Sequence, residues 1–241
     1  MGDLSLLSRP AIAIVGARNA SSLGRRMAYA LARDLGAAGY TVVSGLARGI
    51  DASAHEGALG SGTIAVQGGG VDIIYPSENT RLAQSIAKQG LRLSEQPMGL
   101  QPQARHFPPR NRIIAGIGLA TIVVEAAVKS GSLITARDAL DLGRDVMAVP
   151  GHPFDARASG GNLLIRDGAV LVRDAQDVID ALPPLDHPPA PVRPIDPAAL
   201  PPPPPERRSL RQTAALHQQI LDRLAMAPTP EGQLIDDLDS T

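Results

Sequence analysis

The stretch AIAIVGARNASSLG, residues 11–24, joins a run of apolar residues directly to a glycine-containing turn. The run at 11–16 is rich in β-branched residues and has no polar interruption, which is typical of a strand buried on both faces of a parallel sheet. Apolar residues then recur three or four positions apart over 23–38, and Gly39 follows. This spacing predicts an amphipathic helix that packs back onto the sheet.

Similar apolar runs recur along the chain. They are TVVSG at 41–45, TIAVQG at 63–68, LATIVVEA at 119–126, DVMAVPG at 145–151 and AVLV at 169–172. Because segments with helical spacing separate these runs, the sequence predicts an α/β fold with a doubly wound, mainly parallel sheet.

The composition changes sharply after Leu182, where prolines become dense. Proline lacks a backbone donor and fixes φ, so this stretch predicts an extended linker. Beyond the linker, apolar spacing predicts an amphipathic helix, but about 30 residues are too few to bury a separate core. We therefore expect an α/β domain at 1–182, a proline-rich linker at 183–208 and a small helical region at 209–241.

The composition also excludes several classes of protein. The chain has no cysteine, which rules out a disulfide framework and a thiolate metal site. No apolar run approaches the roughly 20 residues that a membrane-spanning helix needs. The first residues also lack the pattern of a signal peptide, so we expect a cytoplasmic protein without membrane contact.

The formal net charge of −1 hides an uneven distribution of charge. Residues 9–173 hold 18 Lys and Arg against 12 Asp and Glu, a net of +6, whereas the remaining segments hold 5 against 12, a net of −7. A basic body suits a polyanionic partner, although a role in solubility alone also fits this distribution.

The turns after the apolar runs carry the candidate binding residues, because ligands of open α/β sheets bind at the carboxyl ends of the strands. After the first run, Gly16 permits a tight turn and Arg18 adds a positive charge. Ser21 or Ser22 can cap the helix that follows. The spacing GxGxxG of a dinucleotide site is absent, which disfavours generic NAD binding.

The second turn, SGLARGID at 44–51, places Arg48 between two glycines. Its candidate residues are Ser44, Gly45, Arg48 and Gly49. Glycines let a backbone approach a ligand closely, and a guanidinium matches phosphate oxygens, so we interpret this turn as a phosphate-binding loop. The alternative is an ordinary turn with a solvated arginine.

The third turn belongs to AAVKSGSLITA at 126–136, and it is rich in small hydroxyl residues. Its candidate residues are Lys129, Ser130, Gly131, Ser132 and Thr135. Backbone amides at the start of a helix, with a lysine beside them, predict an anion-binding site. The order of a Walker A motif is absent, so nucleoside triphosphate hydrolysis gains no support.

A basic segment, RHFPPRNRII, occupies residues 105–114. Its candidate residues are Arg105, Arg110, Asn111 and Arg112. As a group they suit a phosphodiester chain, while each arginine alone fits equally well an ion pair with Glu95 or Glu125. Phe107 is the one aromatic residue that we expect beside these basic segments. Recognition should therefore follow the phosphate backbone more than the bases.

Two further patterns have structural alternatives. Asp51 and His55 stand four residues apart as two metal ligands would, but no third ligand accompanies them, so we expect a capping Asp and a packed His. No metal ion and no cofactor are predicted. The glycine-rich segment at 150–169 either adds phosphate contacts or closes the edge of the sheet. The residues concerned are Gly160, Gly161 and Asn162.

Several motifs together resemble those of the DprA/Smf family. They are IVGAR, SGLARGIDASAH, GGGVDIIYP, FPPRNRIIAG, VVEAAVKSGSLITA, AVPG and GGNLLIRDGA, and they cover nearly the whole span from Ala11 to Val172. The resemblance implies an extended Rossmann-like fold that binds single-stranded DNA without catalysis, forms a homodimer and loads the RecA recombinase onto DNA in natural transformation. It also implies that Arg48 and Lys129 are the main contacts to the strand.

The resemblance is incomplete at both ends of the chain. The C-terminal region resembles only the opening of the family's winged-helix domain, so we expect a partial winged-helix appendage. The N-terminal helical domain of many members is expected to be absent, because the first apolar run begins near Ala11.

Two other functions remain as alternatives. A nucleotide-5′-monophosphate phosphoribohydrolase of the LOG type resembles this chain in its core and its phosphate loop, PGGxGTxxE. Thr135 stands where the catalytic glutamate of that motif would fall, and no other acid and base pair is evident. A nucleotide-sensing module would need fewer basic loops than this sequence has.

Overall fold

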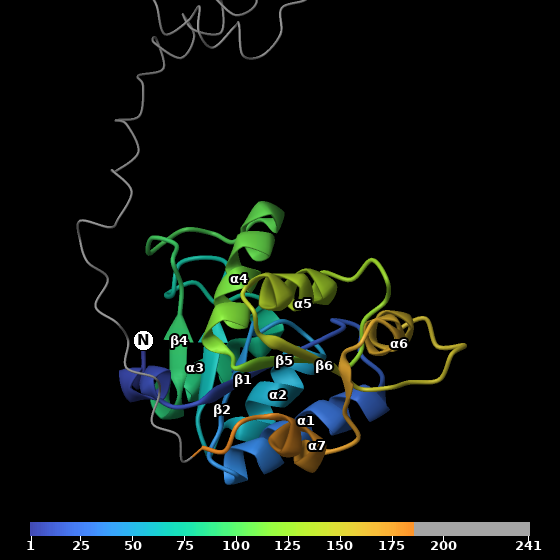
Figure 1. Ribbon diagram of the computed structural model, residues 1–241. Helices are drawn as coiled ribbons and strands as arrows, with labels where there is room; N and C mark the ends of the chain where they lie inside the picture. Colours follow the sequence, from blue (N-terminus) through green and yellow to red (C-terminus); the bar gives the residue numbers. More distant parts are fainter. Residues whose placement is uncertain (186–241) are drawn as a thin grey trace, which may run out of the picture. The chain divides into compact units, whose positions relative to one another are not determined.

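The computed structural model describes residues 1–185, which form a single seven-stranded sheet covered by helices on both faces (Figure 1). The strand order is β4-β3-β2-β1-β5-β6-β7, and every neighbouring pair is parallel. The strands are β1 (Ala11–Val15), β2 (Thr41–Ser44), β3 (Thr63–Val66), β4 (Leu91–Leu93), β5 (Ala120–Val123), β6 (Asp145–Ala148) and β7 (Val170–Leu171). The doubly wound α/β prediction is confirmed.

The helices follow the strands in alternation. The α-helices are α1 (Ser22–Ala37), α2 (Ile50–Ala58), α3 (Thr80–Gln89), α4 (Phe107–Ile117), α5 (Ser132–Asp141), α6 (Ser159–Arg166) and α7 (Ala175–Ala181). Three short 3₁₀ helices are η1 (Leu4–Ser8), η2 (Ser77–Asn79) and η3 (Ala104–His106). In Figure 1, α1, α2 and α7 lie on one side of the sheet, and α4, α5 and α6 lie on the other.

The two faces of the sheet explain why the apolar runs are uninterrupted. All five residues of β1 are buried. Ile12 and Ile14 pack with the helices α1 and α2, whereas Ala13 and Val15 pack with α4 and α5. Successive side chains of a strand point to opposite faces, so a strand covered on both sides needs apolar residues at every position.

Two elements differ from the sequence prediction. The edge strand β4 was not predicted, because it has three residues and its middle residue is Arg92. That guanidinium is buried and donates to the Gln67 side chain at 2.8 Å and to the Val71 carbonyl at 2.6 Å. The basic segment at 105–114 is mostly the helix α4, whose first turn carries two prolines where their missing N–H groups are not needed.

The topology places three connecting loops at one edge of the sheet. The strand order reverses between β1 and β5, and an open crevice forms outside the carboxyl ends of strands at such a point. The loops that follow β1, β2 and β5 therefore meet there. Among the residues described, no helix is long and apolar enough to cross a membrane. The predicted helical region and nearly all of the predicted linker lie outside the described residues.

Candidate functional site

A cleft of about 810 Å³ opens at this carboxyl edge, between the loop after β1, the start of α4 and the start of α5. Most of the predicted binding residues line it, namely Gly16, Arg18, Arg110, Asn111, Lys129, Ser130, Gly131, Ser132 and Thr135. Gly45 and Arg48 line a small adjoining pocket instead, which they share with Arg18. Ser44, Gly49 and Arg112 line neither space.

Arg110 forms the floor of the cleft. Its side chain is 6% exposed, and Nη1 donates to the carbonyls of Gly45 and Val66, both at 2.6 Å. Its Nε has no hydrogen-bond partner in the described part of the protein. Burial lowers the pKa of Arg110, while the nearby Asp51 opposes that fall. An arginine stays charged at any ordinary pH, so the floor carries a fixed positive charge with an unused donor.

Asp51 and His55 hold the neighbouring loop in place. The Asp51 carboxylate accepts from the backbone N–H groups of Gly45 at 3.1 Å and Ala47 at 3.3 Å. Burial raises the pKa of Asp51, and Arg110 together with these two N–H groups opposes the rise. The prediction of a capping role for this residue is wrong, because Gly49 is the N-cap of α2 and no side chain caps this helix. Asp51 lies in the first turn of α2 and ties the preceding loop to it.

His55 is a packed core residue. Its Nε2 accepts from the Leu46 backbone at 3.3 Å, so the ring proton lies on Nδ1, which is 2.7 Å from the Thr63 hydroxyl. Burial lowers the pKa of His55 to about 3, and Arg110 adds to that effect. The ring is therefore neutral at physiological pH. The prediction of a packed histidine is confirmed.

The predicted roles of Ser44 and the two glycines need correction. The Ser44 hydroxyl donates to the Ile14 carbonyl at 2.6 Å inside the sheet, away from the cleft. A Cβ on Gly45 would lie 2.1 Å from Arg110 Nη1, and a Cβ on Gly49 would lie 2.3 Å from the Ala17 carbonyl. The space beside these glycines is therefore filled by the protein itself, which explains why glycine is needed there.

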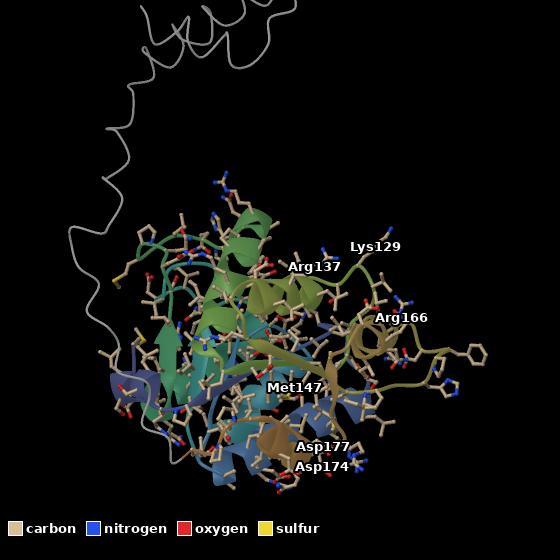
Figure 2. All side chains as sticks on the ribbon, viewed as in Figure 1. Lys129, Arg137, Met147, Arg166, Asp174 and Asp177 are labelled. Carbon is tan, nitrogen blue, oxygen red and sulfur yellow. The ribbon has the colours of Figure 1, made fainter. Side chains whose placement is uncertain are left out.

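Two cations stand at the rim of the cleft. The Arg18 guanidinium lies 5.2 Å from the centre of the Phe107 ring, and Lys129 is exposed on its loop (Figure 2). Within residues 1–185, no carboxylate lies within 4.0 Å of either charge. Tyr75, from the segment after β3, packs 5.7 Å from Phe107. The prediction that Phe107 is the one aromatic residue at this place is therefore wrong.

The start of α5 forms one wall of the cleft. The hydroxyls of Ser130 and Ser132 are 3.1 Å apart, and Asn111 Nδ2 donates to the Gly131 carbonyl at 3.4 Å. The N–H groups of the first three residues of α5 already donate within this turn, to the Ser130 hydroxyl and to the Ser130 and Gly131 carbonyls. The attraction of this helix start for anions therefore comes from the positive end of the helix dipole. Thr135 is 2% exposed within α5, where it supports this wall.

The remaining predicted arginines lie outside the cleft. Arg48 is 61% exposed, and its Nη1 lies 3.4 Å from Glu78. Arg112 pairs with Glu95, as the alternative interpretation of the sequence allowed, while Arg105 is exposed beside His106. The structure thus brings Arg18 and Arg110 together and separates the other arginines of the predicted cluster from them.

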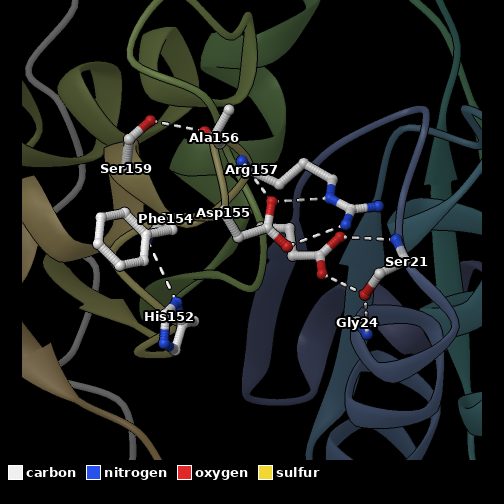
Figure 3. A network of polar contacts seen from close by, with 9 residues as sticks. Ser21, Gly24, His152, Phe154, Asp155, Ala156, Arg157 and Ser159 are labelled. Carbon is white, nitrogen blue, oxygen red and sulfur yellow. Dashed lines mark hydrogen bonds and ion pairs between the residues drawn. The ribbon is translucent and has the colours of Figure 1, made fainter.

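The N-terminus of α1 is already occupied by a carboxylate of the protein. Glu125 accepts from the Ser21 backbone at 2.9 Å and from the Ser21 hydroxyl at 2.5 Å. The Ser21 hydroxyl also caps Gly24, so the prediction of a capping serine is confirmed (Figure 3). A Cβ on Gly24 would lie 2.4 Å from the Glu125 carboxyl carbon. Dinucleotide-binding folds hold a phosphate at this helix start, and here Glu125 fills the same space.

Arg157 is a cleft residue that the sequence analysis missed. It lines the cleft from the loop between β6 and α6, and Asp155 holds its guanidinium through contacts at 3.0 and 2.9 Å (Figure 3). Its position in the loop after a predicted strand was the sequence feature that could have identified it as a cleft residue. The neighbouring Gly160 packs against the Ala126 carbonyl, and Asn162 bonds the Gly151 backbone. Of the two interpretations left open for this segment, these contacts favour closure of the sheet.

Comparisons with known proteins agree on one family. The family described as DNA recombination-mediator protein A matches residues 1–183. The DNA processing protein DprA of Bacillus subtilis (strain 168) is 45% identical over 185 residues, which are 76% of this chain and 62% of that protein. The chain thus spans less than two thirds of this relative's length.

Solved structures give the same result. The X-ray structure of DNA processing protein A (DprA) from Streptococcus pneumoniae matches with 46% identity and a TM-score of 0.73, over 76% of this chain and 65% of that one. A structure of DNA processing protein A from Helicobacter pylori, which gives insight into the single-stranded DNA binding mode of that protein, matches with 34% identity and a TM-score of 0.70. That match covers 74% of this chain and 83% of the other.

Proposed function

Because this chain belongs to the family of DNA recombination-mediator protein A, we propose that its cleft binds single-stranded DNA along the phosphate backbone and leaves the strand chemically unchanged. One observation carries the proposal. Arg18 and Lys129 stand without carboxylate partners among residues 1–185, at the rim of a cleft whose floor is the buried Arg110. A phosphate chain supplies the negative charges that this arrangement lacks.

The chemistry of the cleft favours a strand over a single small anion. Its solvent-facing cations, Arg18, Lys129 and Arg157, come from three separate elements, the loops after β1, β5 and β6. Phe107 and Tyr75 lie beside them and offer ring faces for bases. The described binding mode of the Helicobacter pylori relative supports the same ligand class. Arg48, in the adjoining pocket, extends the set of cations past Phe107.

The lining of the cleft supports binding without hydrolysis. It includes one carboxylate, that of Asp51, which is buried and already accepts from two backbone N–H groups. Glycosidic hydrolysis of the LOG type needs a carboxylate that can reach the substrate, and Thr135 holds the corresponding position.

A nucleotide-sensing function is the second alternative, and Glu125 disfavours it. The helix start that would hold a nucleotide phosphate is filled by this carboxylate. Binding that strengthens with the length of an oligonucleotide would separate the two functions.

A homodimer that passes the strand to the RecA recombinase in the cytoplasm completes the proposal. β7 is one of the two edge strands of the sheet in the described part of the chain, and Val170 and Leu171 are 40% and 41% exposed. An open edge with apolar side chains is a template for pairing with another copy. Sedimentation of the wild type and of Leu171→Lys tests the pairing. The rate of RecA filament growth on a strand that already carries this protein tests the transfer.

The experiment for strand binding is a fluorescence-anisotropy titration of a labelled strand of about 20 thymidines, and of a duplex of equal length, at several salt concentrations. We expect the single strand to bind more tightly and its affinity to fall steeply with salt. Lys129→Ala should weaken binding about tenfold, by the loss of one charge-assisted contact.

Lys88→Ala is the matched control for this titration. Lys88 is the only other lysine in the chain, and it lies exposed in the last turn of α3, at the opposite edge of the sheet. Equal losses in the two variants would show that net charge, and not the cleft, determines affinity. Absence of strand binding, together with binding of a nucleoside monophosphate, would overturn the proposed function.

A further inference from the structure

The loop between β6 and α6 carries at its tip a phenylalanine that takes no part in the core. Phe154 is 96% exposed, which is the largest exposed fraction among the large hydrophobic residues described. The chain has only two phenylalanines and no tryptophan. Single exposed apolar residues are ordinary on protein surfaces, so the case for a ligand rests on what surrounds this ring.

The phenylalanine is held against a second ring. His152 and Phe154 have their ring centres 5.5 Å apart, at an angle of 43° (Figure 3). The Phe154 backbone donates to His152 Nδ1 at 3.3 Å, and the Asp155 backbone donates to the His152 carbonyl at 2.9 Å. These contacts shape the loop as a turn that presents both rings on its outside.

Backbone hydrogen bonds fix this loop to the wall of the cleft. The Ala126 N–H donates to the Arg157 carbonyl at 2.7 Å, and the Gly160 N–H donates to the Ala126 carbonyl at 2.7 Å. Ala126 begins the loop that carries Lys129, and the Arg157 side chain lines the cleft itself. The rings therefore keep a set position relative to the cations of the cleft.

Further positive charge lies on the other side of the loop. A groove of about 980 Å³ there is lined by His152, Arg25 and Arg26. In the described part of the chain, neither arginine has a carboxylate within 4.0 Å. The groove also has acidic residues, of which Glu125 and Asp155 are bonded to Ser21 and Arg157. Glu56 is the exposed carboxylate that remains, and Arg33 is paired with Asp34.

We propose that Phe154 and His152 form a stacking platform for bases of the single strand as it leaves the cleft past Arg157. The inference rests on the proposed function and extends its site by one or more nucleotides. Stacking on an aromatic ring does not depend on sequence, because every base has a flat face. The platform would therefore add affinity for long strands of any sequence and none for strands that end within the cleft.

The test compares a strand of about 20 thymidines with one of about 4, at the lower end of the site sizes of single-strand-binding folds, which is chosen to occupy the cleft without reaching the platform. Phe154→Ala should weaken binding of the long strand about tenfold and leave binding of the short strand unchanged. Leu4→Ala is the control, because Leu4 is also a highly exposed apolar residue, at 66%, but lies in η1 before the first strand.

A second variant reports the stacking directly. The chain has no tryptophan, so Phe154→Trp would introduce a single indole at the platform. We expect this variant to keep its affinity for the long strand, and its fluorescence to be quenched by the long strand but not by the short one. A structural role for Phe154 would not produce quenching that depends on strand length.

The other outcomes separate the inference from the function on which it rests. Unchanged binding of both strands by Phe154→Ala, without quenching in Phe154→Trp, would overturn the platform and leave the cleft as the whole site. A change of oligomeric state in Phe154→Ala, with strand binding unaltered, would overturn it too and assign the loop to self-association. Failure of the wild type to bind either strand would overturn the proposed function itself.

Discussion

The floor and the rim of the cleft both carry cationic side chains, but these side chains differ in burial and in their bonding within the protein. At the floor, Arg110 is buried, bonded to two carbonyls and close to Asp51. At the rim, Arg18 and Lys129 are exposed and have no carboxylate within 4.0 Å in the described residues. The charge of Arg110, which is bonded within the protein, fixes the shape of the site. The charges of Arg18 and Lys129 are available to bind a ligand.

This difference separates stability from affinity. Substitutions at the floor should lower the free energy of unfolding without a specific effect on DNA, because Arg110 joins the loop after β2 to the end of β3. Substitutions at the rim should weaken DNA binding without affecting the free energy of unfolding.

The largest effect is expected at the floor. Arg110→Ala would leave the buried Asp51 without its nearest cation and the Gly45 and Val66 carbonyls without their donor, at a cost of about 3–5 kcal/mol in the free energy of unfolding. Urea unfolding measures this loss. Arg112→Ala, on the same helix and in an exposed ion pair, should cost no more than about 1 kcal/mol. Equal stabilities of the two variants would contradict a structural role for Arg110.

The next effect is expected at the rim. The double variant Arg18→Ala, Lys129→Ala removes two cations that we propose bind phosphates, each contact being worth about 1.5–3 kcal/mol. Affinity for the single strand should fall about 100-fold or more, while the free energy of unfolding stays within about 0.5 kcal/mol of the wild type. Anisotropy and urea unfolding on the same preparation check both values. A large loss of stability would place these residues with the floor.

The third effect is a pH dependence that originates at the floor. The pKa of His55 is about 3 in the folded protein against 6.5 without the fold, so the unfolded state binds more protons between these values. Stability is then complete above pH 6.5 and falls as the pH drops. The loss from His55 at pH 5 is about 2 kcal/mol.

His55→Gln is the variant that isolates this contribution. It removes the titrating ring, so its free energy of unfolding should fall less between pH 7 and about pH 5 than that of the wild type. Parallel falls in the two proteins would mean that His55 is not the group responsible. Asp51 works in the opposite direction, because burial raises its pKa, but it is present in both proteins.

The smallest effect is expected for Arg48. Its side chain is 61% exposed and lies 3.4 Å from Glu78, in the pocket next to the cleft. We expect Arg48→Ala to reduce affinity for the single strand about threefold or less. A loss as large as that of Arg18→Ala would show that the path of the strand runs through the adjoining pocket, as the family resemblance of this arginine implies.

The sequence could predict the parts of the molecule that depend on local patterns. The apolar runs predicted six of the seven strands, and the spacing after Gly16 predicted α1 to within one residue. Lys129 and the hydroxyl residues after it were predicted as an anion site because the start of a helix attracts anions, and the structure places them in the cleft. β4 was missed because a buried arginine replaces the apolar signal in its middle.

The sequence could not predict contacts between residues that are far apart in the chain. Arg110 finds its carbonyl partners 65 and 44 residues away, so its sequence neighbours could not tell it apart from the exposed Arg112. The same holds for Glu125, which lies 104 residues from Ser21. Tyr75 reaches Phe107 only through the fold. The predicted linker at 183–208 and helical region at 209–241 stay predictions.

Amide hydrogen exchange with and without a bound strand of about 20 thymidines tests the central claim most directly. We predict that the strand protects the rim loops at 16–21 and 126–132, and that amides of the floor around Arg110 exchange slowly with and without DNA. Protection confined to another surface, such as the exposed edge at Val170 and Leu171, with the rim loops unchanged, would contradict the account.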